Sequence, residues 1–172
     1  MIVPRLIGGV CNQMFQVAAG YALAKRSNTN LAIHYDNGWF SMSQKGMHHP
    51  SAYRDTIYSK IDSTDIIPKE VYNEESFSYS EIPVPSTDLS LSGYFQSEKY
   101  FADYKDEIKE LFCLDSAHDC SHLLGDDTVG VHIRRGDYLR IPTVLGILDV
   151  DYYKRAIDQV DAETVVICTD RS

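Results

Sequence analysis

The stretch IVPRLIGGVCNQMFQVAAGYALAKR, residues 2–26, decides the fold. A short apolar run opens it, the pair Gly8-Gly9 follows, and apolar residues then recur at helical spacing over 12–26. Residues 31–34 form a second apolar run, so we expect strand, glycine turn, helix and strand, which is a compact βαβ unit. The small alanine-rich face of the helix favours close packing on a parallel sheet.

A second βαβ unit is predicted near the end of the chain. Its strand covers 129–133, its helix 151–160 and its second strand 164–168, and the polar segment 113–127 before it has the composition of a linker. A sheet of only two strands would leave its edges and faces unpaired. Because the chain stops directly after the second of these strands, we expect the sequence to be a fragment of a longer protein.

The central part of the chain is less regular. Residues 89–95 read as a strand, and Tyr100 and Ile108 fall on one face of a helix expected over 98–112. Periodicity is weak over 36–87, which is longer than a loop without short elements should be, and no element is assigned there.

The composition is that of an ordinary globular protein, with 172 residues of which 44% are hydrophobic and 24% charged. Its net charge of −9 argues against a general nucleic-acid or anionic-membrane surface, because both need a basic field. No apolar run approaches the roughly 18 residues of a membrane span. The four cysteines form no CxxC pair and the first apolar run is too short for a signal peptide. We therefore expect reduced thiols and a cytoplasmic location, with peripheral membrane attachment left open.

Gly8 and Gly9 join the first predicted strand to the helix, and Asn12 and Gln13 follow in its opening turn. Unpaired backbone N–H groups at a helix N-terminus favour a phosphate or a sugar hydroxyl, and glycine lets a ligand approach the main chain. The two side-chain amides add donors and acceptors suited to sugar or base edges. A structural interpretation stays open, in which the glycines form a tight turn and Asn12 is the N-cap.

The sequence HIRRGD, residues 132–137, places two arginines and an aspartate where a strand should end. In an extended chain His132 and Arg134 face one side and Arg135 leaves it, so the two arginines have different tasks. One guanidinium can grip a diphosphate through two parallel hydrogen bonds, while Asp137 braces the other. Open α/β sheets bind ligands at the carboxyl ends of their strands. The alternative is a surface ion pair at a strand end.

Two other clusters carry weaker signals. HDCSH, residues 118–122, contains two histidines, but structural zinc takes four ligands in regular pairs and no second pair follows, so no metal site is expected. The carboxylates of DEIKE, residues 106–110, stand beside lysines on the predicted helix. That arrangement favours a solvated helix face.

Four segments of the chain resemble one known family. They are GGVCNQMFQVAAGYALA (8–24), LSGYFQSEKYF (91–101), VGVHIRRGDYL (129–139) and DYYKRAI (151–157). In this order and spacing they resemble the α-1,2-fucosyltransferases, the inverting glycosyltransferases of family eleven. Four segments together are highly specific, whereas RRGD alone would not be.

The resemblance implies a GT-B-like α/β fold, with two Rossmann-like lobes and a cleft between them, the second lobe being incomplete here. An N-terminal acceptor-side lobe would cover 1–124, and the start of a GDP-fucose-binding lobe would cover 125–172. The implied reaction moves L-fucose from GDP-β-L-fucose to the 2-hydroxyl of a terminal galactose, with inversion and without a metal or other cofactor. GDP-fucose and a galactose-terminated oligosaccharide are then the partners.

By the same resemblance, His132, Arg134, Arg135 and Asp137 match the motif H-x-R-R-x-D, whose arginines hold the donor diphosphate. When the bond from fucose C1 to GDP breaks, negative charge builds on the diphosphate. An enzyme without a metal must take up this charge with fixed cations. Arg134 and Arg135 are therefore the expected catalytic residues.

At the other end of the chain, Gly8, Gly9, Asn12 and Gln13 match the motif G-G-x-G-N-Q at the cleft edge of the first lobe. Cys11 replaces the third glycine of that motif. The resemblance makes these four residues expected contacts of the substrates.

Other functions remain open at this point. The chain could transfer a different GDP-linked sugar or build another linkage, although GYFQSEKYF favours the α-1,2 group. It could also be a non-catalytic module that binds a nucleotide sugar or a glycan. In a third interpretation it is a structural domain in which the arginines only brace loops.

Overall fold

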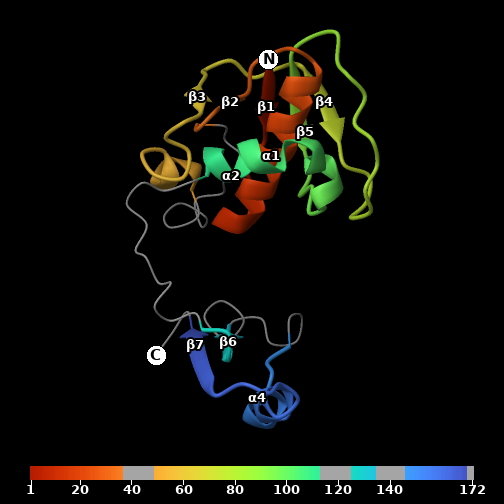
Figure 1. Cartoon of the computed structure of the whole chain (residues 1–172). Helices are drawn as coiled ribbons and strands as arrows, with labels where there is room; N and C mark the ends of the chain where they lie inside the picture. Colours follow the sequence, from red (N-terminus) through yellow and green to blue (C-terminus); the bar gives the residue numbers. More distant parts are fainter. Residues whose placement is uncertain (37–48, 113–124, 135–145, 170–172) are drawn as a thin grey trace. The chain divides into compact units, whose positions relative to one another are not determined.

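The computed structural model describes residues 1–36, 49–112, 125–134 and 146–169 (Figure 1). The chain divides into two compact units, Met1–Ser116 (unit 1) and Ala117–Ser172 (unit 2). Both contain helices and parallel strands, so the predicted α/β class is confirmed. The predicted boundary after residue 124 falls beside residues outside the description and stays a prediction.

Unit 1 is built on short parallel strands. Their bounds are β1 Ile2–Pro4, β2 Ala32–Ile33, β3 Asp62–Ser63, β4 Glu70–Asn73 and β5 Leu89–Ser92. The order in one sheet is β1-β5-β4, and β2 pairs with β3 in another. A parallel bridge between Ile2 and Leu31 places β2 beside β1. The strand order therefore turns at β1, because the chain leaves β1 towards β2 while β5 lies on its other side.

Helix α1, Val10–Arg26, follows β1 and returns the chain to β2, which confirms the first βαβ unit. Its alanine-rich face is buried, and a Cβ at Gly20 would lie 3.0 Å from Cδ1 of Leu31. The expected close packing of this helix on the strands is therefore present. Within the described residues, no helix has both the length and the apolar character to cross a bilayer.

The core of unit 1 consists of two clusters of buried side chains. The first joins β1, α1 and the segment after β4, and it contains Ile2, Ala19, Leu23, Ala24, Ile82, Leu91, Phe95 and Tyr100. The second contains Leu6, Val17, Ile33 and Tyr58. Tyr58 comes from the stretch in which the sequence predicts no element. That stretch holds the short helix η2, Pro50–Tyr53, together with β3 and β4.

The helix expected over 98–112 is interrupted. Three short helices replace it: η3 Glu98–Tyr100, η4 Ala102–Tyr104 and α2 Lys105–Leu111. Phe101 leaves the helical region with φ −139° and ψ 15°, and its ring lies 6.0 Å from that of Phe15 on α1. Tyr100 meanwhile enters the core. A continuous helix could not satisfy both contacts, so this prediction was wrong over its first half.

Helix α2 packs beside α1 (Figure 1), and the contacts between them are exposed. Nζ of Lys25 lies 2.6 Å from Oε2 of Glu107, and the hydroxyl of Tyr21 donates to the same oxygen at 2.6 Å. The Tyr21 ring also meets that of Tyr104 edge-on. These contacts hold α2 and the residue before it against α1.

Unit 2 is the second predicted βαβ unit. Strand β6 Thr128–Ile133, helix α4 Val150–Ile157 and strand β7 Thr164–Thr169 follow in order, and the two strands are parallel. On β6, Val129, Val131 and Ile133 are half-buried and His132 is exposed, as the predicted alternation requires.

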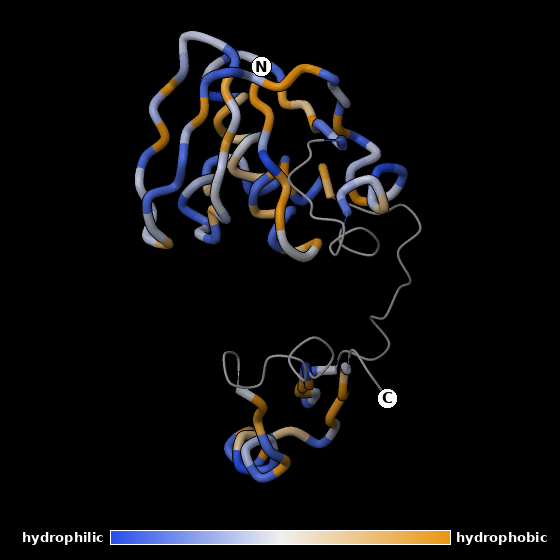
Figure 2. The backbone as a smooth tube through the Cα atoms, turned by 180° about the vertical axis from the view of Figure 1, so that it is seen from behind, coloured by the Kyte–Doolittle hydropathy of each residue, from blue (hydrophilic) through white to orange (hydrophobic). Residues whose placement is uncertain are grey.

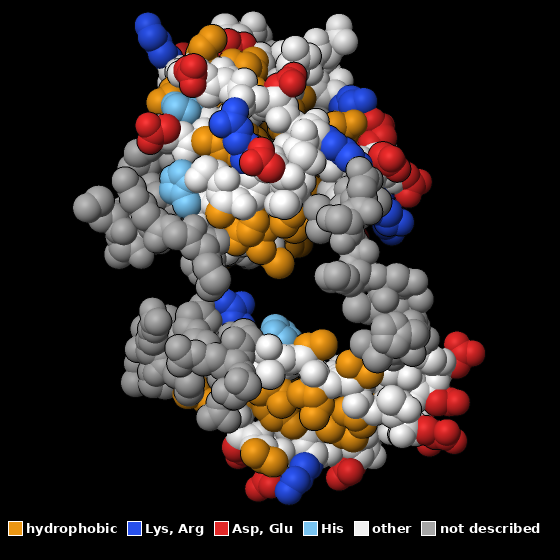
Figure 3. Space-filling view, turned by 90° about the vertical axis from the view of Figure 1, so that its left-hand side faces the viewer, with side chains coloured by type: hydrophobic (Ala, Val, Ile, Leu, Met, Phe, Trp, Pro, Cys, Tyr) orange, Lys and Arg blue, Asp and Glu red, His pale blue; other side chains and the backbone are white. Residues whose placement is uncertain are grey.

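No described residue of unit 2 is buried. Figure 2 shows hydrophobic stretches on β7 and on the segment before α4, and hydrophobic side chains gather on the face of unit 2 seen in Figure 3. The exposed large hydrophobic residues of unit 2 are Ile147, Leu148, Val150, Tyr152, Val160, Val165 and Ile167. Among the described residues, unit 2 thus leaves these apolar side chains at the surface, whereas unit 1 buries a core.

Candidate functional site

The carboxyl ends of β1, β4 and β5 meet at one edge of unit 1, since these strands are parallel neighbours. Gly8 and Gly9 follow β1, Glu74 follows β4, and the turn 93–96 follows β5. Parallel α/β sheets bind ligands at this edge, close to the place where the strand order turns. That place lies between β1 and β5, so the candidate site in unit 1 is built around their two turns.

Gly8 needs to be glycine for two reasons. Its φ is +77°, a conformation that costs other L-residues roughly 1–2 kcal/mol. A Cβ there would lie 2.5 Å from Nδ2 of Asn12. Gly9, in contrast, has an ordinary extended conformation and is the N-cap of α1. The N-cap interpretation of Asn12 was therefore wrong, because Asn12 is the third residue of the helix.

Asn12 and Gln96 connect the two turns. Nε2 of Gln96 donates to Oδ1 of Asn12 at 2.8 Å. Asn12 is half-buried and Gln96 is exposed, so this amide pair lies at the surface of the carboxyl edge. The pair joins residues 84 positions apart in the chain, and Gln96 was not among the predicted site residues.

Gln13 lies beneath the turn and is fully buried. Its Nε2 donates to the carbonyl of Gly8 at 2.9 Å, and its Oε1 accepts from the hydroxyl of Tyr58 at 3.1 Å. Burial raises the pKa of Tyr58, which keeps this hydroxyl protonated as the donor. The structure thus shows Gln13 holding the glycine turn from inside.

Gln16, which the sequence did not indicate as a site residue, supports the same turn. It is also buried, and its side-chain amide accepts from the N–H of Ile7 at 2.9 Å and donates to the carbonyl of Ile7 at 3.2 Å. Burying a side-chain amide costs free energy unless its donors and acceptors form hydrogen bonds. The hydrogen bonds of Gln13 and Gln16 to the main chain of Gly8 and Ile7 therefore satisfy the buried amides and fix the turn.

Glu74 holds the turn after β5. Its Oε2 accepts from the N–H groups of Tyr94 at 2.7 Å and Phe95 at 3.0 Å. A Cβ at Gly93 would lie 2.4 Å from Cβ of Glu74, so only glycine fits there. Phe95 is fully buried and has φ +52°, a strain of about 1–3 kcal/mol for a bulky residue. The predicted strand 89–95 ends at Ser92 because of this turn.

In unit 2, His132 and Arg134 lie at the carboxyl end of β6. His132 is the register partner of Cys168 on β7, and Arg134 comes directly after the strand. Both residues are exposed, on the side of the pleat that the sequence assigned to them. Arg135 and Asp137 lie outside the described residues, and their roles stay predictions.

Of the two weaker clusters, HDCSH lies outside the described residues and DEIKE lies on α2. Among the described residues, no group of three or more His, Cys, Asp or Glu side chains could hold a metal ion. The solvated face predicted for DEIKE is confirmed, since Asp106, Glu107 and Glu110 are exposed. The hydrogen bond from Lys25 lowers the pKa of Glu107, which marks that carboxylate as an ion-pair partner.

A family model described as Glycosyl transferase family 11 matches residues 4–171. The match contains both the glycine turn after β1 and the HIRRGD sequence that begins in β6. The chain belongs to glycosyl transferase family 11. The resemblance found in the four sequence segments is thereby confirmed.

Two curated relatives of this family 11 chain come from Escherichia coli. The chain is 28% identical over 162 residues to an alpha-1,2-colitosyltransferase, with 81% of this chain and 56% of the relative covered. It is 24% identical over 212 residues to the O-antigen biosynthesis glycosyltransferase WbnK, with 94% of this chain and 70% of the relative covered. The chain therefore spans little more than half the length of the first. No solved structure matches the chain.

Proposed function

We propose that this family 11 chain transfers L-fucose from GDP-β-L-fucose to the 2-hydroxyl of a galactoside, with inversion and without a metal. The family match over residues 4–171 is the observation that carries this proposal. The α-1,2 linkage in the name of the first relative supports the choice of the 2-hydroxyl.

In this proposal the chain contains parts of both lobes of a GT-B fold, with residues 1–124 on the acceptor side and 125–172 opening the donor side. The parallel sheet of unit 1 and the βαβ of unit 2 support this assignment, because Rossmann-like lobes are built from such units. Gly8, Gly9 and Asn12 then belong to the acceptor side, and the buried Gln13, predicted with them as a substrate contact, supports their turn through the carbonyl of Gly8.

Arg134 and Arg135 would bind the diphosphate and neutralise it as the bond to fucose C1 breaks, with His132 and Asp137 beside them. Arg134 is exposed at the carboxyl end of β6, where a ligand can reach its guanidinium. A fixed donor aimed at developing charge is worth about 3–4 kcal/mol of barrier. The acceptor 2-hydroxyl attacks C1 from the face opposite GDP, the bond from C1 to the GDP oxygen breaks, and the hydroxyl proton passes to a general base, so that GDP leaves as the free diphosphate.

A second donor is favoured by the name of the first relative, which is a colitosyltransferase. Colitose is L-fucose without the 3-hydroxyl, so both sugars present the same anomeric carbon to an attacking 2-hydroxyl. A site that hydrogen-bonds the 3-hydroxyl would strongly disfavour the deoxy sugar, because its polar groups would be left unpaired.

The test is a competition among GDP-fucose, GDP-colitose and GDP-mannose, with lactose as acceptor and the full chain as enzyme. We expect α-1,2-fucosyllactose, identified by the NMR correlation between the fucose anomeric proton and galactose C2. If GDP-colitose is used in preference to GDP-fucose, the donor assigned to this chain is GDP-colitose. GDP binding without transfer or hydrolysis would indicate a non-catalytic module, and absence of GDP binding at millimolar concentration would refute the donor site.

A further inference from the structure

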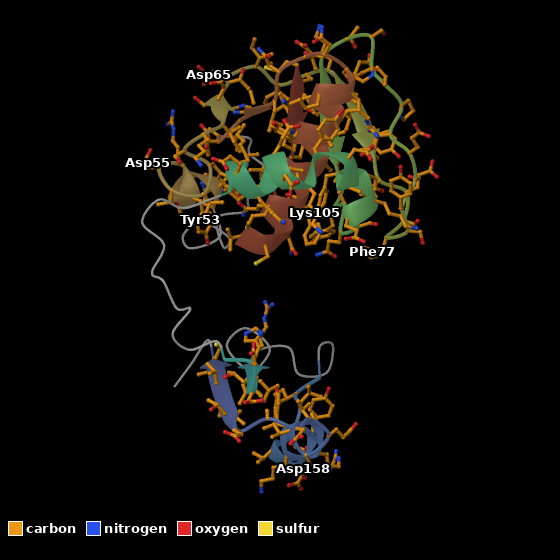
Figure 4. All side chains as sticks on the ribbon, in the orientation of Figure 1. Tyr53, Asp55, Asp65, Phe77, Lys105 and Asp158 are labelled. Atoms are coloured by element: carbon orange, nitrogen blue, oxygen red, sulfur yellow. The ribbon has the colours of Figure 1, made fainter. Side chains whose placement is uncertain are left out.

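Phe77 is the most exposed large hydrophobic side chain in the described residues, with 74% of its surface accessible. A single exposed ring needs no explanation. The Phe77 ring, however, stacks on that of Tyr94, with centroids 6.1 Å apart and planes inclined by 27°. Figure 4 shows Phe77 at the end of unit 1 where α1 begins, which is the end that carries the candidate site.

The turn that carries Tyr94 is held rigidly. Glu74 accepts the N–H groups of Tyr94 and Phe95, the missing side chain of Gly93 makes room for Glu74, and Phe95 is anchored in the core in a left-handed conformation. Strained backbone that the surroundings enforce in this way is concentrated at functional sites. The Tyr94 ring is thus presented on a fixed main chain.

The same turn sends its side chains in three directions. Tyr94 goes to Phe77, Phe95 into the core, and Gln96 to Asn12. The Cα atoms of Tyr94 and Gln96 can be at most about 7 Å apart, since the two residues are two positions apart in the chain. The aromatic pair and the amide pair therefore both include a residue of the turn 93–96, which follows β5.

We propose that Phe77 and Tyr94 form the platform on which the acceptor galactoside stacks, with Asn12 and Gln96 binding its hydroxyls. The axial 4-hydroxyl of galactose leaves one ring face lined by C–H groups, and such a face packs well on an aromatic surface. Side-chain amides can both donate to and accept from the hydroxyls at the ring edge. This inference rests on the proposed function, because it names the acceptor subsite of that reaction.

The local charge distinguishes the acceptor from the donor as occupant of the platform. Glu74 and Glu75 precede Phe77 by three and two residues, and Glu75 is exposed. A nucleotide diphosphate placed there would meet these carboxylates, and like charges repel. A neutral glycan meets no such penalty, so we assign the platform to the sugar acceptor.

The experiment measures binding of methyl β-D-galactoside and methyl β-D-glucoside to the full chain by ligand-observed NMR titration, with GDP titrated separately. We expect the galactoside to bind more tightly, because an equatorial 4-hydroxyl breaks up the C–H face of the glucoside. Phe77→Ala should weaken galactoside binding about tenfold and leave GDP affinity unchanged. Phe77→Trp should retain binding.

Ile66→Ala is the matched control, since Ile66 is an exposed apolar residue of unit 1 with 60% of its surface accessible. It should bind the galactoside as the unaltered chain does. The platform is overturned if Phe77→Ala also does so, if Tyr94→Leu has no effect, or if the unaltered chain binds both sugars equally or neither.

Failure of the proposed function has a different signature. If Phe77→Ala weakens galactoside binding but no GDP-sugar is used as donor, the subsite stands and the proposed transfer is wrong. If transfer to lactose proceeds and Phe77→Ala leaves the KM for lactose unchanged, the transfer stands and the subsite is wrong.

Discussion

Unit 1 and unit 2 both begin with a parallel βαβ arrangement, yet they hold their candidate residues in different ways. In unit 1 the glycine turn rests on the buried side chains of Gln13 and Gln16, and the turn after β5 rests on Glu74. In unit 2 the side chains of His132 and Arg134 are exposed at the carboxyl end of β6. Substitutions in unit 1 should therefore alter stability and function together, whereas those in unit 2 should separate the two.

The largest difference should come from apolar truncation. Leu91→Ala removes a fully buried side chain from the first core cluster of unit 1, so we expect a loss of about 2–5 kcal/mol in the free energy of unfolding. Val165→Ala on β7 removes a side chain that is already exposed, and it should change that quantity by no more than about 0.5 kcal/mol. Urea denaturation followed by circular dichroism measures both. Equal losses would mean that β7 is covered in solution.

Arg134→Ala should have the next largest effect, and on rate instead of stability. Loss of one charge-stabilising donor should lower kcat for fucosyl transfer by two to three orders of magnitude, equivalent to about 3–4 kcal/mol. Arg155→Ala is the control, because Arg155 is exposed on α4 of the same unit. Comparable rates for Arg134→Ala and the unaltered chain would remove Arg134 from the mechanism.

The two units can also be compared through their glycines. Gly8→Ala forces alanine into φ +77° against the Asn12 amide, so we expect a loss of about 1–2 kcal/mol in unfolding free energy. Gly130 on β6 has no atom within 4 Å of an added Cβ, and alanine there should be neutral or slightly stabilising. Thermal unfolding of both variants tests this contrast. A destabilising Gly130→Ala would show that β6 has a close neighbour in solution.

The smallest effect should come from the ion pair between α1 and α2. The hydrogen bond from Lys25 lowers the pKa of Glu107. The pair therefore stabilises unit 1 at pH values above the ordinary glutamate pKa of about 4.3, and this stabilisation is lost as the pH falls through the lowered pKa of Glu107. Glu107→Gln should therefore be slightly less stable than the unaltered chain at pH 7 and equal to it in strong acid. Asp106→Asn, which affects only a pair within α2, should matter less. A stability difference that grows in acid would contradict this account.

The sequence was sufficient for the elements that carry a clear period. The pattern from Ile2 to Arg26 predicted β1 and α1, and the alternation of β6 predicted which side His132 and Arg134 occupy. It failed for β3 and β4, because Asp62–Ser63 and Glu70–Asn73 are mostly polar and form no apolar run. It also missed the break at Phe101, where tertiary contacts overrode helical spacing.

The site was harder to predict than the fold because its contacts are not local. Glu74 binds the turn 93–96 across twenty positions, and Gln96 meets Asn12 across 84. Neither pairing leaves a periodic trace in the sequence. The sequence also could not predict that the Gln13 side chain points into the core, since its partner Tyr58 lies 45 positions away. The GYFQ sequence, residues 93–96, indicated the family, but only the structure shows that Gln96 faces the surface and Phe95 enters the core.

Cys11 is a free, exposed thiol one residue before Asn12, in the first turn of α1. It is therefore a native chemical probe of this edge. A bound glycan that shields the first turn of α1 should slow alkylation of Cys11 by iodoacetamide, which peptide mass spectrometry can follow. Cys168, which is exposed on β7, supplies an internal reference in the same digest. Occupancy of the carboxyl edge can thus be footprinted on the unmodified polypeptide.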